Sequence, residues 1–310
     1  LCKSNSNILL MLSFANGQPN DSLLPKDLFL KATQHALEQD GARFLNYSSN
    51  AGNDHFRENL ATFLSAQPSY KNNPVKGHSI ILTSGNSNGV AQAARLFGKP
   101  NGVVFVEQPT YFLASDIFSK DLGMDVVPMP MDEEGIIVDD SFEALCIKHK
   151  PSLLYTIPVH QNPSGITLSV ERRKKLVDMS IKYNFIILSD EVYQLLSFGG
   201  YIPPPPLASI DTSSDTGGVV SLHSFSKILS PGMRLGWYHI TNHRLLNKID
   251  TCGELSSGGN QNYAPQLVNS MISLGLLVPH IDKIITAFTQ NLNALCTVLD
   301  NKFGAESDFP

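Results

Sequence analysis

One lysine stands among hydroxyl and guanidinium groups, in a segment that also contains flexible glycine and proline positions. Lys227 follows Ser224 and Ser226 and precedes Arg234 in the run SFSKILSPGMRLG. A lysine amine can form an imine with an aldehyde, whereas hydroxyls and an arginine fork suit a phosphate. The segment therefore favours a ligand with both groups. The alternative is a polar loop whose lysine and arginine are solvated.

A second group of small polar residues lies between a predicted strand and a predicted helix. Asn86 and Ser87 belong to the run TSGNSNG, which separates the apolar residues 80–83 from a helical pattern over 90–97. Unpaired backbone N–H groups at a helix N-terminus bind anions. The run is a candidate phosphate site, although a simple helix cap would have the same composition.

Four further residues of suitable chemistry follow apolar runs. Tyr111 could stack on a pyridine ring, and Asp190 could pair with its nitrogen and keep it protonated. Tyr193 would face the same side if a helical turn begins at Asp190, and Asn162 lies in an Asn-Pro turn. Each residue also has a purely structural alternative: Tyr111 could be an ordinary core tyrosine, Asp190 could belong to the first turn of a helix, and Asn162 could belong to an ordinary turn.

Short continuous apolar runs alternate with helical patterns along the chain, which predicts an α/β fold with a mostly parallel sheet. Continuous rather than alternating runs indicate strands that are buried on both faces. In such sheets ligands bind beyond the carboxyl ends of the strands, and each candidate above follows a strand end. The predicted strands are 80–83, 103–106, 153–157, 185–188 and 219–223, with helices at 90–97, 169–183 and 279–303.

These motifs, in this order over residues 14–300, resemble the class I/II aminotransferases, which are fold-type I enzymes that use pyridoxal phosphate (PLP). The detail of the lysine segment is most similar to the 2-aminoadipate aminotransferase branch. The resemblance implies a three-layer α/β/α fold whose small C-terminal domain is largely absent. It divides the chain into an N-terminal arm with part of the small domain (1–45), a large PLP-binding domain (46–285), and a linking helix that starts a truncated small domain (286–310).

The resemblance also implies roles for individual residues. Lys227 would form the imine with PLP, Asp190 would pair with the ring nitrogen, and Tyr111 would cover the ring. Asn162 and Tyr193 would bind the ring 3-oxygen, and these catalytic and binding roles need no metal. The phosphate would be held by Asn86, Ser87, Ser224, Ser226 and Arg234.

Two N-terminal elements match the same family. Gly17, in the run FANGQPN, would lie over the substrate together with Asn162. Tyr47, in NYSSNAG, would reach the phosphate of the partner subunit, which implies a homodimer with shared sites. The arginine that binds the substrate α-carboxylate would lie beyond residue 310.

The expected activity is transfer of an amino group between an α-amino acid and a 2-oxo acid. Two alternatives stay open: a PLP-dependent lyase of the same fold, and a non-catalytic effector-binding domain of a transcription regulator. The cofactor residues alone do not separate the two enzymatic outcomes.

Composition argues against a nucleic-acid-binding protein and against a membrane-spanning protein. A net charge of −5 over 310 residues offers no basic stripe for nucleic acid, and no apolar run approaches the ~20 residues of a membrane span. Four widely spaced cysteines favour a reducing, cytoplasmic setting. The chain begins at Leu1 rather than Met, so a targeting segment could precede it.

Overall fold

A single mixed sheet of eight strands organises the part of the chain that the computed structural model describes, residues 17–250 and 258–304. The strand order is β1-β8-β7-β6-β5-β2-β3-β4. The pairs β2–β3, β2–β5, β5–β6 and β6–β7 are parallel, whereas β8 is antiparallel to both of its neighbours. The strands are β1 (Ile80–Thr83), β2 (Val103–Gln108), β3 (Asp125–Asp132), β4 (Gly135–Ile136), β5 (Leu153–Thr156), β6 (Ile186–Asp190), β7 (Val219–Ser224) and β8 (Gly236–His239).

All five predicted strands are present, with ends that differ by at most two residues. Three strands were not predicted. β3 contains two prolines and has a partly exposed pattern, β4 has only two residues, and β8 reads GWYH, which contains no aliphatic side chain. Only their pairing with neighbouring strands makes them part of the sheet.

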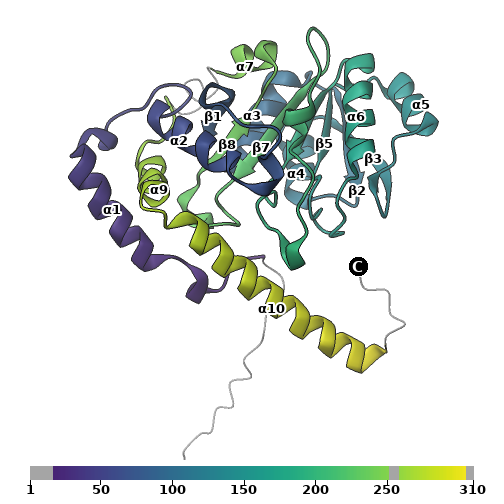
Figure 1. Ribbon diagram of the computed structural model, residues 1–310. Helices are drawn as coiled ribbons and strands as arrows, with labels where there is room; N and C mark the ends of the chain where they lie inside the picture. Colours follow the sequence, from purple (N-terminus) through teal and green to yellow (C-terminus); the bar gives the residue numbers. More distant parts are fainter. Residues whose placement is uncertain (1–16, 251–257, 305–310) are drawn as a thin grey trace, which may run out of the picture.

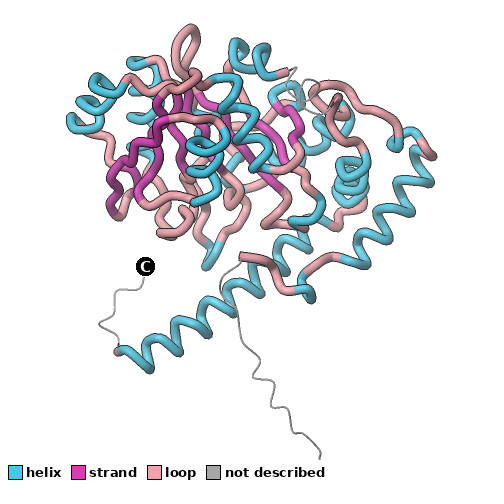
Figure 2. Tube along the Cα trace, turned by 180° about the vertical axis from the view of Figure 1, so that it is seen from behind, coloured by secondary structure: helices cyan, strands magenta, loops and turns pink. Residues whose placement is uncertain are grey.

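Helices cover both faces of the sheet, which confirms the predicted three-layer α/β/α class (Figures 1 and 2). α3 and α7 pack with Phe118 on one face, and α5 and α6 pack on the other. A third apolar cluster joins α1, α2, α9 and α10 beside the sheet. The helices are α1 (Lys26–Asp40), α2 (Asp54–Ser65), α3 (Asn86–Phe97), α4 (Phe112–Asp116), α5 (Asp140–His149), α6 (Val170–Tyr183), α7 (His243–Ile249), α9 (Tyr263–Ser273) and α10 (Leu277–Phe303).

The first residues of α6 and α3 show how local sequence determines where a helix begins. Ser169 caps α6, because its side chain accepts a hydrogen bond from the backbone N–H of Arg172. α3 begins at Asn86, four residues before the predicted start at residue 90. Its cap is Gly85, at φ +84°, and no side chain caps it. Residues 86–89 of the polar run therefore form the first turn of the helix, and only Ser84 and Gly85 lie between the strand and the helix.

α10 begins two residues before the predicted helix and leaves the body of the molecule along its length (Figure 1). Ile281 and Ile284 are buried in its first turns, but Leu292 and Leu295 are 50% and 44% exposed. Among the described helices, none alone has the length and apolarity to cross a bilayer. α9 and α10 reach both only as a pair, across a 92° bend. The three predicted domain ranges stay a prediction.

Candidate active site

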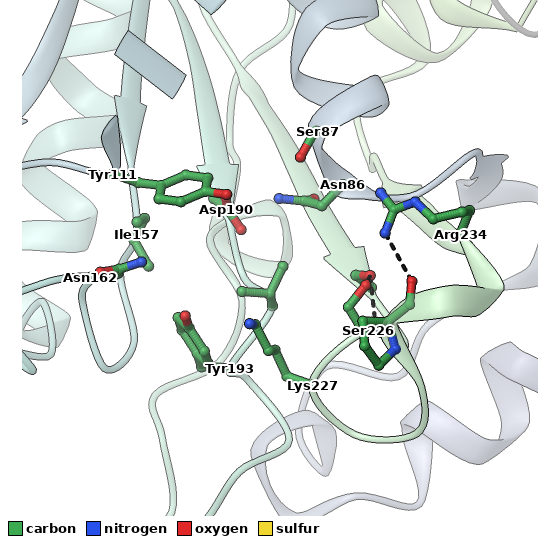
Figure 3. Close-up of a pocket in the computed structure, with 13 residues that line it drawn as sticks. Asn86, Ser87, Tyr111, Ile157, Asn162, Asp190, Tyr193, Ser226, Lys227 and Arg234 are labelled. Atoms are coloured by element: carbon green, nitrogen blue, oxygen red, sulfur yellow. Dashed lines mark hydrogen bonds between the residues drawn. The ribbon is translucent and has the colours of Figure 1, made fainter. Parts of the chain in front are cut away.

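A cavity of about 190 Å³ lies beyond the carboxyl ends of the central strands. Every predicted site residue except Gly17 and Tyr47 lines it, although the residues come from segments up to 148 positions apart. The parallel arrangement explains this convergence, because strand ends of one direction meet at one edge. Residues not predicted also line the cavity, namely Ile157, Val192 and Pro231. Its predicted lining residues are Asn86, Ser87, Tyr111, Asn162, Asp190, Tyr193, Ser224, Ser226, Lys227 and Arg234 (Figure 3).

One end of the cavity can hold an anion. The uncapped first turn of α3 presents backbone N–H groups there, and Ser224 donates to Ser226 across 2.8 Å between their hydroxyl oxygens. Arg234 donates from Nη1 to the carbonyl of Pro231 at 3.0 Å. A Cβ placed on Gly85 would lie 2.5 Å from Nη2 of Arg234, so the absence of a side chain at Gly85 makes room for the guanidinium. These donors fit a phosphate group.

Asp190 supplies a buried carboxylate at the end of β6. It is 3% exposed, and its Oδ2 accepts a hydrogen bond of 2.6 Å from the hydroxyl of Tyr155. Burial raises the pKa of Asp190 to about 6, against the opposing effect of that hydrogen bond. Its Oδ1 is buried and has no hydrogen-bond partner among the described residues. A buried acceptor of this kind fits a protonated ring nitrogen.

Lys227 lies in the turn that follows β7, and its Nζ donates to the carbonyl of Gly17 at 3.0 Å. Burial lowers the pKa of the lysine, and the nearby charge of Asp190 opposes that effect. A lowered pKa increases the fraction of neutral amine, which is the nucleophilic form.

Gly17 is thus placed beside the lysine, at the edge of an adjoining cavity of about 380 Å³ that shares Lys227 and Tyr193. Residues 14–16 of the same predicted motif lie outside the described residues. The predicted role of Gly17 in covering the substrate stays a prediction.

The side chains that could contact a ring lie around the carboxylate and the amine. In the view of Figure 3, Tyr111 and Asn162 lie across the cavity from Arg234, with Asp190 and Lys227 between them. Burial raises the pKa of Tyr193 to about 12, so its hydroxyl is a donor at neutral pH. Tyr193 lies in a turn of residues 192–195 and not in the helix that was considered for it.

Tyr47 is 90% exposed and does not line this cavity within the single chain. It lines a separate, open hollow together with Ser84 and residues 258–262. The role predicted for Tyr47 requires a partner subunit, and it stays a prediction.

Three buried residues that support the site were missed. Glu107 accepts hydrogen bonds from the Thr156 hydroxyl (2.5 Å) and the Ile157 N–H (3.0 Å), and burial raises its pKa to about 7. Gln161 donates to the Pro109 carbonyl at 2.8 Å. Tyr155, the third residue, bonds Asp190. Glu107 and Gln161 stood beside predicted residues, which was the available signal, whereas Tyr155 reads as an ordinary strand aromatic.

Comparison with known proteins identifies the family of this chain. The sequence model described as Aminotransferase class I and II matches residues 11–308. The aromatic-amino-acid aminotransferase 1 of Thermococcus litoralis is 30% identical over 294 residues, which cover 94% of this chain and 68% of that protein.

Two solved structures share the fold. The kynurenine aminotransferase of Pyrococcus horikoshii, in complex with PMP, superposes with a TM-score of 0.82 at 27% identity, covering 94% of this chain and 71% of that one. The α-aminoadipate aminotransferase LysN of Thermus thermophilus, complexed with N-(5'-phosphopyridoxyl)-L-leucine, gives 0.82 at 26% identity, covering 94% and 72%. The chain belongs to the class I and II aminotransferase family.

Proposed function

We propose that this protein is a PLP-dependent aminotransferase that moves an amino group between an α-amino acid and a 2-oxo acid, with Lys227 as the covalent anchor. The observation that carries the proposal is the single cavity that brings together the Lys227 amine, the unpartnered Oδ1 of Asp190 and an anion cradle. When bound, PLP supplies an aldehyde for amines and a ring that accepts electrons from a carbanion.

The residues of the cavity divide the binding of the cofactor among them. The first turn of α3, the two serines and Arg234 hold the phosphate. Asp190 would accept the N–H of the ring through Oδ1 and thereby hold the proton on that nitrogen. Tyr111 would cover the ring, and Asn162 and Tyr193 would donate to its 3-oxygen.

Lys227 has two tasks in this proposal. Its Nζ would bind the aldehyde of PLP covalently, with release of water, and the amine of an incoming amino acid would take its place. The freed, neutral Nζ would then serve as the base that accepts the substrate α-proton and as the acid that returns it. The lowered pKa of Lys227 suits the first of these proton transfers.

The relatives are named for aromatic amino acids, kynurenine and α-aminoadipate, and we propose an α-amino acid substrate of this range. The exposure of Tyr47 supports a homodimer in which this side chain reaches the partner's phosphate site. We also propose a cytoplasmic location, on the strength of the cysteine usage.

The test begins with the covalent anchor. Protein loaded with PLP is reduced with borohydride and digested, and the adduct is expected on the peptide that contains Lys227. Lys227→Ala should lose both the adduct and the visible absorption band, whereas Lys76→Ala, a substitution at an exposed lysine, should retain both. An adduct on another lysine, or a band unchanged by Lys227→Ala, would remove Lys227 from this role.

The reaction type is tested separately. The loaded protein is mixed with one amino acid at a time, without a 2-oxo acid, and the products are measured. An aminotransferase should give one equivalent of 2-oxo acid per site and no ammonia, and then turn over when 2-oxoglutarate is added. Release of ammonia with repeated turnover would instead indicate a lyase.

A further inference from the structure

Tyr155 donates a buried side-chain hydrogen bond to Asp190, and the side chain of Asn86 and the backbone N–H of Val192 also favour the ionised form of this carboxylate. Tyr155 lies in β5, opposite Leu188 of the adjacent strand β6, and its hydroxyl donates to Oδ2 of Asp190 at 2.6 Å. The tyrosine is completely buried, and its ring packs edge-on against Phe118 at 5.6 Å between centroids. The hydroxyl is therefore held in place by a rigid strand and a packed ring.

In this hydrogen bond the Tyr155 hydroxyl is the donor and Oδ2 of Asp190 is the acceptor. Burial, and secondly the charge of Asp190, raise the pKa of Tyr155 well above its ordinary value, so the phenol keeps its proton. It donates to Oδ2 and leaves Oδ1 without a partner among the described residues. The two oxygens of Asp190 are thus unequal, and only Oδ1 is left for a ligand.

The same bond affects the charge of the carboxylate. Burial without a donor favours the neutral form of a carboxyl group. Tyr155 opposes that effect at Asp190. A neutral carboxyl group could not hold a proton on a ring nitrogen, because the acid would carry the proton itself.

We propose that Tyr155 is a positioning residue for the cofactor: it fixes the rotation of the Asp190 carboxylate so that Oδ1 accepts the ring N–H, and it keeps this carboxylate ionised. The inference rests on the proposed function, because it names the residue that prepares Asp190 for PLP. Tyr155 does not line the cavity, so it acts through Asp190 and not on the ligand.

The test compares PLP affinity among four proteins: wild type, Tyr155→Phe, Asp190→Asn and the double variant. Tyr155→Phe keeps the ring and removes only the donor. Because a hydrogen bond to a charged group is lost, its affinity near pH 7 should fall about tenfold or more. In the Asp190→Asn background the same change should alter affinity less than about twofold, because the partner of the hydroxyl no longer carries a charge.

A second measurement needs no cofactor. The pKa of Asp190 in the apo protein can be followed by NMR of ¹³C-labelled aspartate carboxyls, with the signal assigned through Asp190→Asn. Tyr155→Phe should raise this pKa by about one unit. Incorporation of 3-fluorotyrosine at position 155 keeps the ring and the hydroxyl and makes the hydroxyl a stronger donor, so it should lower the pKa instead. The fluorinated protein therefore tests the proposal even if Tyr155→Phe folds poorly.

Tyr70→Phe is the matched control, because Tyr70 is also completely buried but its hydroxyl has no hydrogen-bond partner among the described residues. It should leave both PLP affinity and the Asp190 pKa unchanged. The inference is overturned if Tyr155→Phe behaves like this control, or if it weakens binding equally in the Asp190→Asn background. A wild-type protein that binds no PLP would instead refute the proposed function.

Discussion

Substitution of Gly85 by alanine should weaken cofactor binding, and this loss can be measured separately from the effect of the substitution on folding stability. The residue caps α3 at φ +84° and ψ 167°, and a Cβ there would lie 2.5 Å from Nη2 and 2.9 Å from Cζ of Arg234. Atoms do not approach so closely, so something must move. The guanidinium ends a flexible side chain, and we therefore expect Gly85→Ala to displace it from the anion cradle.

Two free energies follow from this displacement. Loss of a hydrogen bond between Arg234 and a phosphate costs about 1.5–3 kcal/mol, which corresponds to a roughly 10- to 150-fold weaker Kd for PLP. Separately, alanine in a backbone region that favours glycine costs about 1–3 kcal/mol of folding stability. Gly41→Ala isolates the second effect, because Gly41 also has a positive φ (+58°) but an added Cβ would meet no atom within 4 Å.

The assay combines urea unfolding with PLP titration by equilibrium dialysis. Both alanine variants should unfold at lower urea concentration, but only Gly85→Ala should lose PLP affinity. In an Arg234→Ala background the loss at Gly85 should shrink, because the displaced group is already gone. Wild-type PLP affinity in Gly85→Ala, or an equal loss in Gly41→Ala, would refute the role of the guanidinium.

Three other predictions concern charge, assembly and local stability. Burial raises the pKa of Asp190 from 3.8 to about 6, so the native apo protein binds the proton more tightly than the unfolded chain and loses stability as pH rises between these values. Apo Asp190→Asn should therefore be more stable than wild type at pH 7, by up to about 3 kcal/mol, and this gain in stability should vanish below about pH 4. Urea unfolding of both proteins at pH 7 and at pH 4 measures the gain. An equal gain at both pH values would contradict the charge argument. Mixing Tyr47→Ala with Lys227→Ala should restore part of the activity that each variant lacks, through heterodimers with one intact site, whereas a fully active monomer in light scattering would exclude shared sites. Amides of residues 291–303 in α10 should exchange hydrogen faster than those of 277–284, because their side chains are largely exposed; equal protection would show that the helix unfolds as one unit.

Much of the fold could be predicted because its signals are local. The strands β1, β2, β5, β6 and β7 contain continuous apolar runs, and burial on both faces requires such runs. The cap of α6 depends on one serine and the three residues after it. β3 and β8 could not be recognised in the same way, because their membership in the sheet depends on strands distant in sequence.

The residues of the candidate site also differ in whether the local sequence makes them recognisable. Residues that must offer their own chemical group to a ligand, such as Lys227, Asn162 and Asp190, occur in short motifs whose composition is visible. Glu107 and Tyr155 act on other residues, and their partners lie 49 and 35 positions away. For Glu107 the sequence offered only its nearness to a predicted motif, and for Tyr155 it offered no signal.

The sequence by itself determined which side chains could hold a phosphate, an amine-reactive carbon and a ring, because those are properties of residue types and short spacings. Only the tertiary structure decided that Oδ2 of Asp190 is taken by Tyr155 and that Oδ1 is left over. It also decided that the carboxylate is buried enough to raise its pKa. Both outcomes depend on the register of β5 against β6 and on the exclusion of water by the surrounding layers, which are long-range consequences of folding that no local segment encodes.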